Sequence, residues 1–129
     1  MSDFISKLKK APGFVCLGPV DEKQVEIAEK ALNVTFSKEY TEYVKAYGAA
    51  SFDKHLLTGV SDENSLNVIS ITLAAREANP TIPDDMYVVE ELHIDGILVW
   101  QNTDGTVYIS RPGTATRKEA SSLQEYLKL

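Results

Sequence analysis

The sequence predicts an α+β fold in which two leading helices are followed by an antiparallel sheet and a closing helix. In the first half, apolar residues recur with a helical period between recognisable helix caps. In the second half, short apolar segments are separated by turn-forming residue pairs, which is typical of strands. The 129 residues are 43% hydrophobic and 25% charged, so we expect residues 1–129 to form one globular domain.

Residues 1–13 are predicted to contain one short helix, over 3–10. Ser2 can cap its N-terminus, and Pro12-Gly13 ends it. The apolar residues on one side of this helix are Phe4, Ile5 and Leu8.

The second predicted helix begins after Asp21, an N-cap residue with Gln24 at the capping-box position. Val20 and Val25 can form a hydrophobic staple, and Asn33 stands where a left-handed C-cap residue is expected. The residues expected on its buried side are Val25, Ile27, Ala28, Ala31 and Leu32.

A third helix is predicted between the N-cap Ser37 and Gly48, which tolerates a positive φ. Two short helices joined by about four residues must pack against each other or against a shared sheet. The stripe at i, i+3, i+4 and i+7 that we expect to be buried is Tyr40, Tyr43, Val44 and Tyr47.

The middle of the chain is less regular. Residues 56–60 predict the start of a strand. Residues 66–78 begin with β-branched character and continue with a helical pattern, and we interpret them as a helix that ends at Asn79-Pro80.

The last third predicts strands and one helix. Asp104-Gly105 is a hairpin signal, Trp100 is expected in the core, and Ser122 with Glu125 forms a capping box for a final helix. The predicted strands are 86–91, 97–101 and 106–110.

Charge is distributed unevenly along the chain. Residues 21–104 carry a net charge of −10, whereas residues 1–20 and 105–129 carry +2 each, which gives the overall −6. This balance argues against direct binding of nucleic acid, which requires a basic surface, and against binding of anionic membranes.

The N-terminal residues show neither a signal peptide nor a membrane span, so we expect a cytoplasmic protein. Cys16 is the single cysteine and has apolar neighbours, so we expect a free, buried thiol. The sequence does not establish the oligomeric state.

Known catalytic and ligand-binding motifs are missing from the sequence. His55 and His93 are 38 residues apart, and no spacing suits a zinc site or a phosphate-binding loop. His93 and Asp95 form an H-x-D pair that is typical of a polar loop. We therefore predict no enzymatic activity, no metal and no cofactor. A small hydrolase would require His55 or His93 to touch a carboxylate in a deep polar pocket.

Several short motifs, in order and spacing, resemble the SUKH superfamily. They cover residues 14–128, nearly the whole chain. The residues that agree with the family pattern are Ala28-Glu29, Leu32, Tyr40, Tyr43, Tyr47, Gly48, Leu57-Thr58-Gly59, Val68, Thr72, Arg76, Pro83, Tyr87-Val88-Val89, Asp104-Gly105-Thr106-Val107-Tyr108 and Ser122 to Leu127.

The resemblance implies an α+β fold with an antiparallel or mixed sheet, which we expect to have about four to six strands. N-terminal helices, one middle helix and a C-terminal helix would flank this sheet. It also implies an immunity protein that binds and neutralises a cognate bacterial toxin domain, with a nuclease as the expected target. The alternative is a non-enzymatic regulatory scaffold that binds a host protein.

An acidic face would suit a basic toxin domain, because opposite charge steers association and can occupy a substrate channel. Binding residues concentrate in loops and at strand ends. The candidate partner-binding residues are Asp62, Glu63, Asp84, Asp85, Glu90, Glu91 and Asp95.

Overall fold

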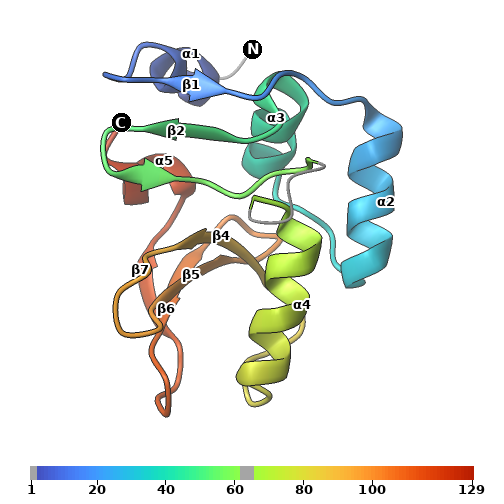
Figure 1. Ribbon diagram of the computed structural model, residues 1–129, viewed down its shortest axis with the longest axis vertical. Helices are drawn as coiled ribbons and strands as arrows, with labels where there is room; N and C mark the ends of the chain where they lie inside the picture. Colours follow the sequence, from blue (N-terminus) through green and yellow to red (C-terminus); the bar gives the residue numbers. More distant parts are fainter. Residues whose placement is uncertain (1–2, 62–65) are drawn as a thin grey trace.

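A computed structural model describes residues 3–61 and 66–129. Within these residues the chain forms five helices and two antiparallel sheets, which confirms the α+β fold (Figure 1). The elements are α1 (Asp3–Lys9), β1 (Val15–Cys16), α2 (Glu22–Leu32), α3 (Lys38–Tyr47), β2 (Ala50–Phe52), β3 (His55–Leu56), α4 (Val68–Ala78), β4 (Tyr87–Glu91), β5 (Leu98–Gln101), β6 (Val107–Ser110), β7 (Arg117–Ala120) and α5 (Leu123–Leu127).

The strands form two sheets, with orders β1-β2-β3 and β4-β5-β6-β7. The sheets meet where the chain leaving β3 runs beside β4. An isolated antiparallel bridge pairs Leu57 with Glu90, and the Thr58 amide donates to the Val89 carbonyl at 2.9 Å. The predicted strand over 56–60 is therefore a two-residue strand followed by single bridges.

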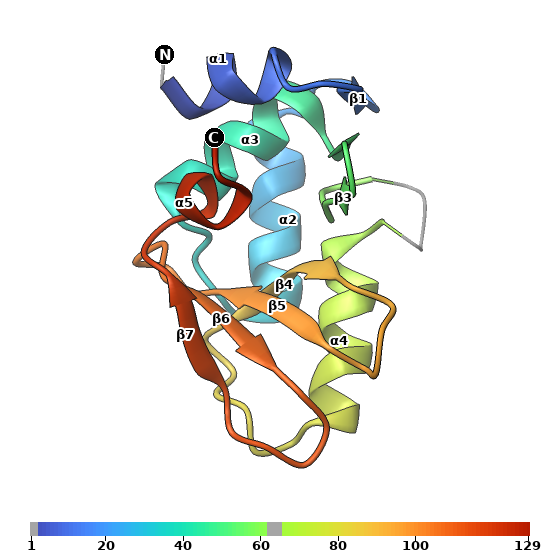
Figure 2. The same cartoon turned by 90° about the vertical axis from the view of Figure 1, so that its left-hand side faces the viewer.

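The four-stranded sheet separates two apolar cores. Its inner face, which includes Tyr87, Val89 and Val99, packs with α1, α2, α3 and α5 in the larger core. Val88 and Trp100 on the outer face pack against α4 in a smaller core. Trp100 is fully buried, as predicted. In Figure 2 the sheet crosses the lower half of the molecule, with α4 behind it.

The predicted caps Asp21, Ser37 and Ser122 are confirmed, whereas Ser2 lies outside the described residues. The Glu125 carboxylate accepts from the Ser121 amide, so the predicted capping box at Ser122 is only half formed. The Asp21 carboxylate accepts from the Gln24 amide at 2.9 Å, and the Gln24 side chain accepts from the Asp21 amide at 3.1 Å. Asn33 ends α2 in the left-handed conformation, with φ of 55°. Two residues expected on the buried side of α2 are instead exposed, Ile27 by 56% and also Ala31, because only Val25, Ala28 and Leu32 of this helix pack into the core.

Two further expectations fail. Cys16 is exposed, because β1 is the outermost strand of its sheet and packs on neither side within the described residues. Strand β7 was missed, because Arg117, Lys118 and Glu119 are exposed and the segment has no apolar alternation. Both strands lie at sheet edges, where few residues are buried and the sequence therefore shows no clear apolar pattern.

Three glycines bring separate segments into close contact. A side chain at Gly59 would collide with the carbonyl oxygen of Gly48, and one at Gly48 would collide with the carbonyl of Gly18. The Val60 amide donates to the Gly48 carbonyl at 3.1 Å. This crossing fixes the chain after β3 against the end of α3.

We expect Gly59→Ala to lower the free energy of unfolding by about 3 kcal/mol, because the obstructing atoms are backbone and cannot rotate away. Gly113→Ala is the control. Gly113 has φ of +78° but open space around it, so about 1 kcal/mol is expected from conformation alone. Urea unfolding of both variants measures the difference, and equal losses would contradict the close-approach explanation.

Candidate functional site

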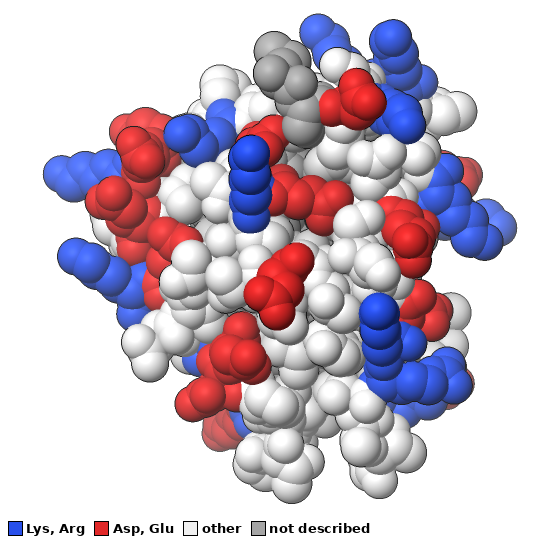
Figure 3. Space-filling model, turned by 180° about the vertical axis from the view of Figure 1, so that it is seen from behind, with Lys and Arg blue, Asp and Glu red and all other residues white. Residues whose placement is uncertain are grey.

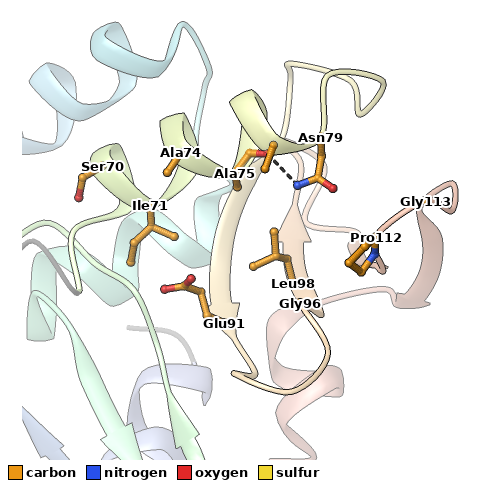
Figure 4. A pocket seen from close by; sticks show the side chains of 11 residues that line it. Ser70, Ile71, Ala74, Ala75, Asn79, Glu91, Gly96, Leu98, Pro112 and Gly113 are labelled. Carbon is orange, nitrogen blue, oxygen red and sulfur yellow. Dashed lines mark hydrogen bonds between the residues drawn. The ribbon is translucent and has the colours of Figure 1, made fainter.

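A groove of about 830 Å³ runs beside α4 on the outer face of the four-stranded sheet. Its floor is apolar, formed by Ile71 and Ala75 of α4 and by Leu98 of β5. Figure 4 shows the Glu91 carboxylate beside Ile71 at one end, and Asn79 and Gly113 toward the other. The groove thus combines an apolar floor with a carboxylate.

A second hollow of about 640 Å³ continues the groove, because both are lined by Ala78, Asn79 and Gly113. It lies between the loops 79–83 and 112–116, neither of which contains an Asp, Glu, Lys or Arg residue. Figure 3 shows this end of the molecule, at its lower edge, as two projections without charged side chains. We call the groove and this uncharged end together the α4 surface.

Small side chains on α4 leave room for the groove, and polar contacts hold the helix in place. The Arg76 guanidinium donates to the carbonyls of Leu32 in α2, at 2.9 Å, and of Asp84, at 2.8 Å. The Thr72 hydroxyl accepts from the Val88 amide of β4 at 3.0 Å. The α4 surface is therefore built on elements with fixed positions.

Of the four exposed or half-buried candidate acids, Glu91 is the one that lines the α4 surface. Asp84 and Asp85 are exposed and directly follow its loop 79–83. Glu91 lines the groove, and Asp95 is exposed next to the lining residue Gly96. Asp85 and Glu91 lie at opposite ends of the segment that contains β4, at most about 20 Å apart along an extended strand.

The other three candidate partner-binding residues are not found on the described surface. Asp62 and Glu63 lie outside the described residues. Glu90 is 1% exposed, so its predicted place on the surface is wrong. A bulge between Val88 and Glu90 shifts the register of β4, which turns Glu90 toward the inner face and Glu91 toward the groove. Two consecutive glutamates do not indicate in the sequence which of them faces the core, because the bulge arises from the pairing of β4 with β5.

Glu90 is instead the centre of a buried cluster where β3, β4 and α5 meet. Its carboxylate accepts from the Tyr126 hydroxyl at 2.6 Å, the Leu56 amide at 3.0 Å and His55 Nδ1 at 3.0 Å. Hydrogen bonding to Glu90 raises the pKa of His55, and burial raises the pKa of the Tyr126 hydroxyl, which therefore stays protonated.

This cluster meets one condition of the hydrolase alternative, since a histidine touches a carboxylate. Three donors already use the Glu90 oxygens, however, and no described hollow is lined by His55. His93 and Asp95 are exposed loop residues with positive φ. Within the described residues no group of three or more His, Cys, Asp or Glu side chains could hold a metal ion. The Glu90 cluster is a buried hydrogen-bonded group that contains an ion pair when His55 is protonated.

A family model described as SMI1-KNR4 cell-wall, SUKH_5, matches residues 1–129. The chain belongs to the SUKH_5 family. This confirms the resemblance to the SUKH superfamily, which includes toxin immunity proteins and generally binds protein partners without enzymatic activity.

A crystal structure of a protein from Pseudomonas syringae pv. tomato has the same fold as this SUKH_5 chain, with a TM-score of 0.77 at 16% sequence identity. The match covers 99% of this chain and 96% of the other. No curated protein matches the sequence. None of the helices in the described part of the chain is long and apolar enough to cross a membrane.

The motif residues that carried the family resemblance build the SUKH_5 fold and do not line the groove. Tyr40, Tyr43 and Thr72 are fully buried and hydrogen-bonded, and Arg76 joins α4 to α2 and to Met86, directly before β4. Sequence motifs therefore indicated the scaffold, whereas the groove depends on small residues such as Ala74, which leave no pattern.

The ion pair of this SUKH_5 protein makes its stability depend on pH. Because the pKa of His55 is raised in the folded state, its contribution is complete below the unfolded pKa of about 6.5 and is lost as pH rises through the folded pKa. We expect the free energy of unfolding to fall as pH rises from about 6 to 8.

Urea unfolding across this range measures the effect. His55→Gln should flatten the slope, whereas the exposed control His93→Gln should preserve it. A slope that survives His55→Gln would assign the pH dependence to another group.

Proposed function

We propose that this protein is an immunity protein that binds and neutralises a cognate bacterial toxin domain through the α4 surface. The observation that carries the proposal is the apolar groove, with Glu91 in its lining and the exposed Asp95 next to its lining residue Gly96. Membership of a superfamily that includes immunity proteins supports it.

The composition of the α4 surface suits a protein partner. Protein interfaces have a core depleted of charge and a polar rim that stays accessible to solvent. Here the floor of Ile71, Ala75 and Leu98 and the uncharged loops form the core, and Glu91 and Asp95 belong to the rim. Ile94, in the loop between Glu91 and Leu98, is also apolar and 62% exposed.

Charge favours a basic partner such as a nuclease. The chain carries −6 overall, so a domain with a basic substrate channel would be attracted at long range. Glu91 and Asp95 can meet lysine or arginine residues around that channel, while an apolar anchor enters the groove. Binding would cover the channel and exclude the nucleic acid.

The test is co-expression with the C-terminal domain of the toxin gene next to this one. The proposal predicts a stable complex and rescued growth. Absence of a complex and of rescue with every neighbouring toxin would refute it, and a complex with a host protein alone would favour the regulatory scaffold.

Ala74→Arg places a long side chain at an exposed position that lines the groove. We expect affinity for the toxin domain to fall about 30-fold, equivalent to about 2 kcal/mol, because the anchor is displaced. Ala31→Arg, an exposed alanine on α2, is the matched control and should bind normally. Calorimetry compares the two, and an equal loss in both would show that added positive charge, rather than the groove, is responsible.

A further inference from the structure

The outer edge of the three-stranded sheet is open, and we propose that a second copy of this chain pairs with it. The pairing joins β1 of one copy to β1 of the other, antiparallel, with Cys16 opposite Cys16. This surface is separate from the α4 surface, and the proposal is independent of the proposed function.

The backbone of β1 has hydrogen-bonding groups directed away from its own sheet. Val15 pairs with Ser51, and the Leu17 amide donates to the Ala49 carbonyl at 3.0 Å. In an antiparallel pair alternate residues bond to the partner strand, so the N–H and C=O groups of Cys16, between these two, face the open side. Within the described residues no strand lies beyond β1.

The side chains along this edge are exposed and apolar. Val15 is 63% exposed, Leu17 55% and the nearby Ile27 of α2 56%. Leu17 and Ile27 also line a hollow of about 490 Å³. Sheet edges in monomeric proteins are usually protected by charged residues or proline, and residues 14–18 contain neither. An edge of this kind is suited to strand pairing.

The charges before and after β1 favour a second copy of this chain as the partner of the open edge. The segment before β1 is basic, with Lys9 and Lys10, and the segment after it is acidic, with Asp21 and Glu22. Antiparallel pairing about a twofold axis places the basic end of each copy beside the acidic end of the other. A uniformly basic partner, such as the proposed toxin domain, would meet the lysines unfavourably.

The proposed register places the two Cys16 residues opposite each other, so a thiol crosslink can report the dimer. Residues that exchange both backbone hydrogen bonds across antiparallel strands have Cα atoms about 5.5 Å apart. This lies within the range of about 4.4–6.8 Å seen for bridged cysteines, so the two Cys16 thiols would be within reach of a short thiol crosslinker.

Sedimentation of the reduced protein over a range of concentrations tests the proposal. We expect a reversible monomer–dimer equilibrium, and a short bismaleimide should crosslink the dimer through Cys16. Val15→Lys should weaken the dimer at least 10-fold, because lysine at a strand edge opposes pairing. Leu73→Lys is the matched control, since Leu73 is 46% exposed on α4, and it should leave the dimer unchanged.

A monomer at every concentration would overturn the proposal. A dimer that is unaffected by Val15→Lys and not crosslinked through Cys16 would overturn it too, because pairing would then use another surface. A normal thermal transition of Val15→Lys shows that the variant is folded, and crosslinking of the unmodified protein gives an independent measurement.

Discussion

Two buried tyrosine hydroxyls of α3 hold the parts of this fold together through Thr58. The Tyr40 hydroxyl and the Thr58 hydroxyl are 2.9 Å apart, and the Tyr43 hydroxyl donates to the Thr58 carbonyl at 2.8 Å. Tyr43 also accepts from the Ala50 amide of β2 at 2.9 Å. Burial raises the pKa of both phenols, so they remain neutral hydrogen-bonding groups. Removing one partner would leave buried polar groups unsatisfied, which costs about 1–3 kcal/mol for each.

The same network positions the α4 surface. The Thr58 hydroxyl donates to the Val88 carbonyl at 2.8 Å, and the Val88 amide donates to Thr72 of α4 at 3.0 Å. A single residue of β4 thus links the tyrosines of α3 to the helix that borders the groove. Arg76 adds the connection from α4 to α2. These hydrogen bonds hold the α4 side of the groove to the core, which favours recognition by a preformed surface.

Local signals in the sequence were sufficient for the helices. Asp21, Ser37 and Ser122 each accept from a backbone amide at the predicted helix start, because a cap is decided by residues three apart. The fate of Glu90 and Glu91 could not be predicted, because a bulge formed by pairing with β5 exchanges their faces. Cys16 was misplaced for a similar reason, since only the strand order shows that β1 is an edge. The sequence did not indicate the groove, because its lining comes from α4, β5 and loops that are distant along the chain, and the role of the candidate acids stays a prediction.

Hydrogen exchange of the amides, with and without the cognate toxin domain, tests the central claim that this SUKH_5 protein acts through the α4 surface. The account predicts slower exchange on complex formation in loops 79–83 and 112–116 and in residues 91–98, with β1 and α2 unchanged. Protection confined to β1 and α2, with these loops unaffected, would contradict it.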